Sequence, residues 1–187
     1  LLLERTIRKI ANPLRYLTKY KKLMRDVDFM GYEHQINLSE KISDDIMSET
    51  WSLVQVNTPG RMIIPSSPAL EYTNYYEPMP ENYHTKGDHY NEFKVTGKRQ
   101  YKIGLKAAHV LGRPSYFSHL PDGRAYLVIG NFFNNPSSTY AEEPPDLEGT
   151  KGHSFHIYDD DGTFGGFAEL ECNGQTIGGS TGKSETS

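Results

Sequence analysis

Short strand-like segments separated by turn residues recur through most of the chain, and this pattern limits the fold more than any other feature. Residues 115–120 and 124–133 flank Pro121-Asp122-Gly123, a typical hairpin signal. Further strand-like segments comprise residues 50–56, 61–64, 92–95, 99–105, 153–158 and 167–173. The series predicts an all-β fold, either an antiparallel β-sandwich or a closed sheet. No repeat of about 20 to 50 residues is present, which argues against a propeller.

The N-terminal part and the middle of the chain are less regular. Residues 1–10 and 27–40 have strand-like patterns, while residues 14–25 place apolar side chains near helical spacing. Residues 11–26 are therefore expected to form a short amphipathic helix packed on a sheet, or an inserted loop. Residues 66–90 are rich in Pro, Tyr, Asn and Glu, and a loop of that length is usually functional or disordered.

Length and composition exclude several classes of protein. The 187 residues suffice for a single β-sandwich domain with a core, expected over residues 1–187. The way the chain opens and closes suggests a piece of a longer protein, in which case the sandwich is incomplete. The net charge of −4 does not match nucleic acid, although residues 1–26 carry eight Lys and Arg against two acids. No apolar stretch is long enough for a membrane span, so neither a nucleic-acid nor a membrane partner is expected.

The run from Phe167 to Asn173 is expected to be a strand with two different faces. Alternation places Glu169 and Glu171 on one face, and Ala168, Leu170 and Cys172 on the other. Two neighbouring carboxylates would raise each other's pKa if desolvated, which suits acid/base chemistry. The alternative is an edge strand with a solvated polar face. Cys172 is the only cysteine, so an internal disulfide is excluded and the cellular compartment cannot be inferred from cysteine usage. It lies among the apolar positions of the strand, which does not suit a catalytic thiol.

Other clusters of polar residues give weaker signals. His84, Asp88, His89 and Glu92 are capable metal ligands, but their spacing fits no specific zinc pattern, and no metal or other cofactor is expected. The stretch 159–162 fits a hairpin turn better than a calcium loop. The glycine-rich stretch 179–184 lacks the spacing of a phosphate-binding loop. The tyrosines of residues 66–90 could stack on sugars or pack on the sheet surface.

A series of short motifs in this order resembles the C-terminal part of the galactose-mutarotase-like (aldose 1-epimerase-like) superfamily, in an uncharacterised bacterial branch. These motifs are Arg5-Thr6-Ile7, Gly31–Leu38, Glu49–Gln55, Ile63-Ile64-Pro65, Lys102–Leu105, Tyr140 with Glu142–Pro145, and Phe167–Glu171. The resemblance implies a large antiparallel β-sandwich with a sugar site on one sheet. It also implies a Glu as general base on the anomeric hydroxyl and a His as acid on the ring oxygen.

Glu171 best matches the family's base, with Glu169 as the alternative. The family's His has no counterpart, because the corresponding strand ends in Gln55, which binds hydroxyls but cannot act as a general acid. Either His84 or His89 could replace it. The side chains expected to contact the sugar are Trp51, Gln55, Lys102, Arg113 and His89.

The expected partner is thus a carbohydrate. Three functions remain open: an aldose 1-epimerase-like isomerase, a non-catalytic carbohydrate-binding module on the same fold, and a structural domain with solvated acids. Neither the sugar nor the oligomeric state follows from these patterns.

Overall fold

The computed structural model describes residues 1–40, 45–179 and 184–186, and this part of the chain is all-β. Its strands are β1 (Leu2–Lys9), β2 (Tyr32–Ser39), β3 (Trp51–Asn57), β4 (Gly60–Pro65), β5 (Tyr72–Asn74), β6 (His84–Lys86), β7 (Tyr90–Val95), β8 (Tyr101–Lys106), β9 (Ser115–His119), β10 (Ala125–Ile129), β11 (His153–Asp159), β12 (Phe167–Asn173) and β13 (Ser184–Thr186). Two short 3-10 helices, η1 (Thr18–Tyr20) and η2 (Glu81–Tyr83), are the helical elements of the described residues. Among these residues no helix has the length and apolarity to cross a membrane.

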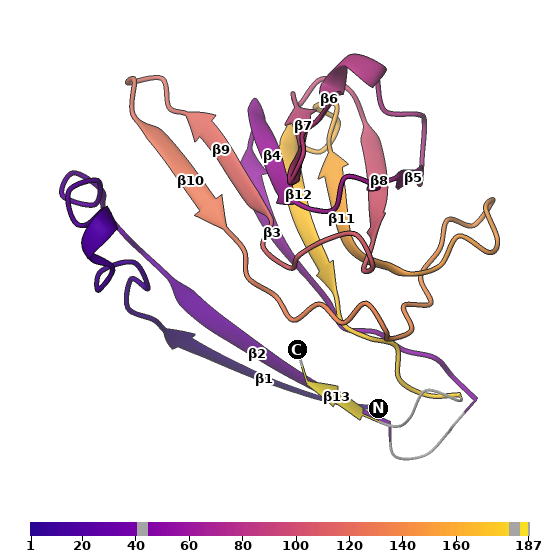
Figure 1. The fold of residues 1–187 in the computed structure, drawn as a ribbon. Helices are drawn as coiled ribbons and strands as arrows, with labels where there is room; N and C mark the ends of the chain where they lie inside the picture. Colours follow the sequence, from indigo (N-terminus) through magenta and orange to yellow (C-terminus); the bar gives the residue numbers. More distant parts are fainter. Residues whose placement is uncertain (41–44, 180–183, 187) are drawn as a thin grey trace.

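The strands form two five-stranded antiparallel sheets and a smaller three-stranded sheet (Figure 1). One large sheet has the order β10-β9-β4-β7-β6, and the other has the order β3-β12-β11-β8-β5. The small sheet has the order β1-β2-β13. The two large sheets share one apolar core, so the architecture is sandwich-like, and the all-β antiparallel prediction is confirmed at this level.

The core between the large sheets follows from the alternation of side chains along each strand. Phe93 and Val95 point inward from β7, and Ile103 and Leu105 from β8, and all four are fully buried. Burial of each such side chain contributes about 1.5–3 kcal/mol. Tyr101 is also fully buried, and its hydroxyl donates to the backbone oxygen of Lys94 at 2.7 Å. Since the inner face of each large sheet packs in this core, polar groups are left to the outer faces.

Two of the predicted turns join strands as expected. The β9–β10 hairpin closes over Gly123, which has a φ of 86° that favours glycine. The β11–β12 hairpin closes over residues 160–166, where the Asp160 carboxylate accepts the backbone N–H groups of Gly162, Phe164 and Gly166. These bonds explain the acidic stretch as turn chemistry.

Residues 66–90 are more ordered than a structureless loop. The strand β5 pairs with β8, and β6 pairs with β7, so this stretch supplies an edge strand to each large sheet. Each strand has only three residues. Such strands are too short to give a periodic pattern in sequence.

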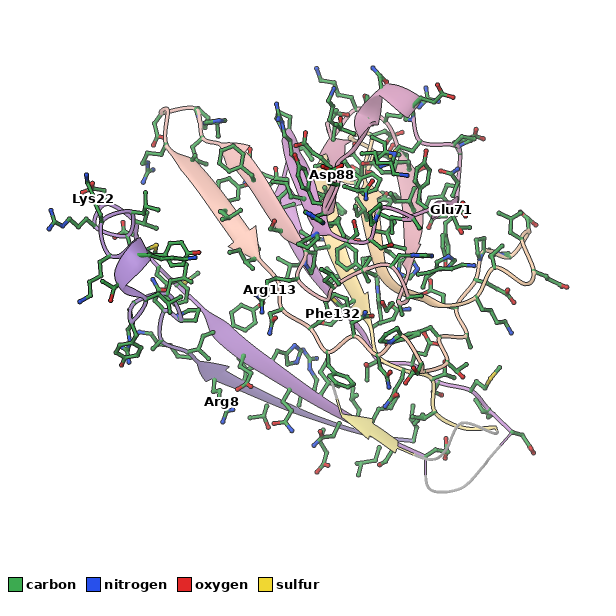
Figure 2. All side chains as sticks on the ribbon, in the orientation of Figure 1. Arg8, Lys22, Glu71, Asp88, Arg113 and Phe132 are labelled. Carbon is green, nitrogen blue, oxygen red and sulfur yellow. The ribbon has the colours of Figure 1, made fainter. Side chains whose placement is uncertain are left out.

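The β1–β2 hairpin projects from the sandwich as an arm (Figure 1). Residues 14–25 form turns around η1 and no α-helix, so the loop alternative holds. Leu17 is 46% exposed and Leu23 70% exposed. The predicted packing of this segment on a sheet is therefore wrong. The basic side chain of Lys22 lies at the tip of the arm (Figure 2).

Candidate functional site

The strand β12 is an internal strand, paired with β3 on one side and β11 on the other. Ala168 and Leu170 enter the core, as the alternation predicts. Glu169 and Glu171, however, are 8% and 2% exposed. The alternative of an edge strand with solvated acids is wrong, because neighbouring strands and the side chains above them cover this face too.

Glu171 is held by two donors from other strands of the same sheet, one on β3, which pairs with β12, and one on β8, which lies beyond β11. The indole Nε1 of Trp51 donates to Glu171 Oε2 at 2.9 Å, and Lys102 Nζ donates to the same oxygen at 2.9 Å. Burial raises the pKa of Glu171, against the opposing effect of Lys102 and Trp51. Burial disfavours the Lys102 ammonium, but the negative field of Glu171 and Glu142 outweighs it and raises the pKa of Lys102. The pair thus joins a buried carboxylate, 2% exposed, to a partly buried ammonium, 13% exposed.

Glu169 lies two residues before Glu171 on β12 and on the same face of the strand. Its Oε1 accepts a hydrogen bond from Gln55 Nε2 at 2.8 Å, and the two residues are register partners across β3 and β12. The structure therefore pairs two of the predicted site residues with each other.

Tyr75 and two histidines form a hydrogen-bonded chain above this face of the sheet. The Tyr75 hydroxyl lies 2.9 Å from His153 Nδ1 and 3.1 Å from His156 Nε2, and His153 Nε2 lies 3.0 Å from Thr73 Oγ1. Gly104 makes room for them, because a Cβ there would lie 2.7 Å from Tyr75 Cε2 and 2.8 Å from His153 Cγ.

Both histidines are buried and neutral. Burial, then the charge of Lys106, lowers the pKa of His153 to about 4. Burial, then the charge of Lys102, lowers the pKa of His156 well below its usual range. Since a hydroxyl has one proton, Tyr75 donates to one ring and accepts from the other. At neutral pH these rings position neighbouring groups and do not act as cationic acids.

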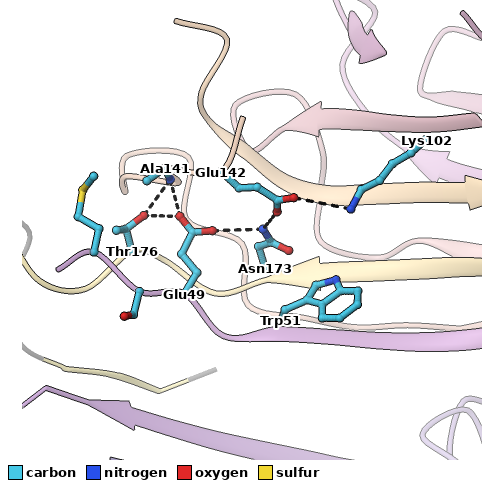
Figure 3. Close-up of a pocket in the computed structure, with 9 residues that line it drawn as sticks. Glu49, Trp51, Lys102, Ala141, Glu142, Asn173 and Thr176 are labelled. Carbon is cyan, nitrogen blue, oxygen red and sulfur yellow. Dashed lines mark hydrogen bonds and ion pairs between the residues drawn. The ribbon is translucent and has the colours of Figure 1, made fainter. Parts of the chain in front are cut away.

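A pocket of about 550 Å³ opens beside this network (Figure 3). Its lining residues are Met47, Ser48, Glu49, Trp51, Lys102, Ala141, Glu142, Asn173 and Thr176. The Asn173 amide nitrogen donates to Glu142 and, at 3.2 Å, to Glu49 Oε2. Lys102 Nζ lies 3.6 Å from Glu142 Oε1, which joins the pocket to the buried Glu171 pair.

Glu49 is fixed by groups from two distant segments. Its Oε1 accepts hydrogen bonds from the backbone N–H of Ala141 and from the hydroxyl of Thr176 (Figure 3). The backbone oxygen of Thr139 accepts from the N–H of Thr176 at 2.8 Å, which ties the same two segments together. The residues before β3, after β12 and between β10 and β11 thereby converge on one pocket.

The structure brings some of the predicted sugar-contacting residues together and leaves others elsewhere. Trp51 and Lys102 line the pocket, and Glu171 lies beneath them. Arg113, before β9, is beside Asn131 at the other large sheet, with Nε 3.4 Å from Asn131 Oδ1 (Figure 2). His89 lies between β6 and β7 at that same sheet.

Several pocket residues were missed as site residues. Glu49 and Glu142 lie within the motifs that carry the family resemblance, which is a signal that could have been used. Asn173 shares the alternating face of Glu171, since both lie on β12 at odd positions. Tyr75 was among the tyrosines of residues 66–90 considered for sugar stacking, but its contact with His156 gave no signal, because it depends on the pairing of strands far apart in sequence.

The candidate metal ligands are not assembled into a site. His84 stacks on Phe93, with ring centroids 4.7 Å apart, and its Nε2 lies 2.6 Å from Asn91 Oδ1. No group of three metal-binding side chains occurs within residues 1–40, 45–179 and 184–186. Residues 180–183 of the glycine-rich stretch lie outside the described residues.

Burial, then the charge of Glu171, raises the pKa of the Cys172 thiol to about 12.

Comparisons with protein-family models, with curated proteins and with solved structures gave no match for this chain.

Proposed function

We propose that this chain is a carbohydrate-binding protein whose ligand occupies the pocket between Trp51, Lys102 and Glu142. The observation that carries the proposal is the position of Trp51 at the pocket, where its side chain is 55% exposed beside charged and amide groups. Sugars present an apolar ring face and a rim of hydroxyls, so an exposed indole with acceptors and donors around it suits them. The indole N–H donates to Glu171, which fixes the orientation of the ring.

The mutarotase-like identity of the sandwich is part of this proposal. It is supported by the position of Glu171 on a late, internal strand, and by the convergence of two motifs of the resemblance, around Glu49 and Glu142, on one pocket.

An aldose 1-epimerase-like isomerase is the second candidate, and the Glu171–Lys102 pair supports it. Glu171 would take the proton of the anomeric hydroxyl, the ring C–O bond would open, and Lys102 would deliver a proton to the ring oxygen. Reclosure on either face then gives both anomers. The binding function is preferred because Glu171 is only 2% exposed and both donors occupy its Oε2.

Proton NMR on a panel of free aldoses tests both candidates. Saturation transfer from the protein to sugar signals is expected, together with a loss of affinity of about tenfold in Trp51→Ala, since aromatic stacking is worth about 1 kcal/mol or more. Phe133→Ala is the matched control, because Phe133 is 64% exposed and outside the pocket lining.

Exchange between α and β anomers separates the enzyme from the binding module. Accelerated exchange with catalytic amounts of protein, lost in Glu171→Gln, would establish the isomerase. Binding without exchange would establish the module. Absence of saturation transfer from the folded protein to every sugar would contradict the proposed function.

A further inference from the structure

Charged carboxylate oxygens are prominent among the hydrogen-bond acceptors of the pocket. Glu49 and Glu142 each present two carboxylate oxygens, while the donors around them are an amide NH₂, one backbone N–H, one hydroxyl and one ammonium. These donors already bond the carboxylates from the protein side. A ligand that supplies N–H or O–H donors is therefore favoured over one that supplies acceptors.

The Asn173 amide gives an independent sign of a missing donor. Asn173 is 3% exposed, and its Oδ1 is a buried acceptor with no hydrogen-bond partner among the described residues. The nitrogen of the same amide bridges Glu49 and Glu142, so the Asn173 side chain is anchored by this acidic cluster (Figure 3). An unsatisfied buried acceptor costs about 1–3 kcal/mol. A ligand donor would recover this cost once the Asn173 amide turns its Oδ1 toward the pocket.

The charges of the pocket are also unbalanced. The Lys102 ammonium is closest to Glu171, at 2.9 Å, and is shared with Glu142 at 3.6 Å. Three carboxylates thus accompany one cation. The negative field reaches the neighbouring hydroxyl, because burial and then Glu142, Glu49 and Glu171 raise the pKa of Tyr75.

We infer that the pocket selects an amino sugar, whose protonated amine binds on the pocket side of the Glu142 carboxylate, beside the Asn173 amide that links Glu142 to Glu49. This inference rests on the proposed sugar-binding function and names the class of sugar. A neutral sugar would supply no counter-charge to Glu49 and Glu142. An acidic sugar would be repelled by both carboxylates.

Calorimetric titration of the intact chain with matched probes tests the inference. The probes are glucosamine, glucose, N-acetylglucosamine and glucuronate, together with galactosamine and galactose in case the pocket prefers the other ring stereochemistry. At least one amino sugar should bind about tenfold more tightly than its neutral counterpart, because a hydrogen bond to a charged group is worth about 1.5–3 kcal/mol. Acetylation of the amine should remove that advantage, and glucuronate should bind most weakly.

The Glu142→Gln variant should bring the affinity ratio of amino to neutral sugar close to one. Glu143→Gln is the matched control, since Glu143 pairs with Lys151 at 3.5 Å and does not line the pocket, and it should keep the wild-type ratio. Equal affinity for amino and neutral sugars in the wild-type protein would overturn the inference and leave the proposed function standing. Failure of all six sugars to bind would contradict the proposed function, and the inference with it.

Discussion

The two large sheets share one core but differ on their outer faces. In β7 buried and more accessible residues alternate, so that Phe93 and Val95 are buried while Lys94 is exposed. In β11 all seven residues are buried. At β11 the second sheet is therefore buried on both faces, whereas the first follows the ordinary pattern of an antiparallel sheet with one solvated face.

The extra layer on the second sheet is polar. His156, Glu171 and Lys102 lie on its outer face beneath Tyr75 and Glu142. Burying such groups costs free energy unless each finds a partner, and an apolar layer would satisfy the fold more simply. The comparison locates the candidate site on the outer face of one sheet, and this polar layer is where the proposed binding function is assigned.

Removal of the Lys102 charge should produce the largest difference between the sheets. Lys102→Met leaves Glu171 buried without its cation and is expected to destabilise the protein by about 3–5 kcal/mol. Lys94→Met removes an exposed lysine from the other outer face and should change the free energy of unfolding by less than about 0.5 kcal/mol. Urea unfolding measures both.

A double variant sharpens this result. Lys102→Met with Glu171→Leu should recover part of the loss, because no unpaired charge then remains buried. Equal stability of the two single lysine variants would contradict the view that Glu171 and Lys102 form a buried ion pair on the second outer face.

Acidification should lower the free energy of unfolding through protonation of His153 on the second sheet. The pKa of His153 is about 4 in the folded chain against a usual 6.5, so the unfolded state binds more protons between these values. Stability from this group is therefore lost as pH falls from about 6.5 toward 4, by about 3 kcal/mol in total. The pKa of Asp159, raised to about 6 by burial, acts in the opposite direction.

The measurable quantity is the change in slope when His153 is replaced. Unfolding free energies at several pH values between 4 and 6.5 should rise less steeply with pH in His153→Gln than in the wild type. His119→Gln, an exposed position on β9, is the control and should preserve the wild-type slope. An identical slope in His153→Gln and the wild type would show that His153 is not buried in neutral form.

Loss of one hydroxyl should give the smallest of these effects. Tyr75→Phe removes the group that joins His153 and His156, and the expected cost is about 1–3 kcal/mol, since buried ring nitrogens lose their partner. Tyr90→Phe, at a position 47% exposed on β7, is the matched control, with little change in unfolding free energy. A similar, small cost for both would argue against the hydrogen-bonded chain.

The fold was largely predictable because alternation and turn chemistry are local. The β9–β10 hairpin and the two faces of β12 around Leu170 follow from neighbouring residues alone. The turn predicted at residues 159–162 is present but starts one residue later, since Asp159 is the last residue of β11. The segment 14–25 was predicted less well. Its apolar side chains have helical spacing, but the segment lies in the connection between β1 and β2, and the pairing of these two strands as a hairpin determines its conformation.

The site was predicted in part, and a strand irregularity explains one omission. His153 and His156 are three residues apart, which would place them on opposite faces of a regular strand. A shift in register between His153 and Phe155 interrupts the strand, so that both rings reach the Tyr75 hydroxyl. Glu49 and Glu142 meet only through the folded chain, at Asn173, and no local pattern could show this.

The fluorescence of Trp51 provides the most direct test, because it is the only tryptophan in the chain and it lines the pocket. Titration of the folded protein with amino and neutral sugars should give a saturable change in emission, strongest for an amino sugar. The same titration of Glu142→Gln should lose the preference and keep the signal. An emission spectrum unchanged by every sugar, from a protein shown to be folded, would contradict a carbohydrate site at Trp51.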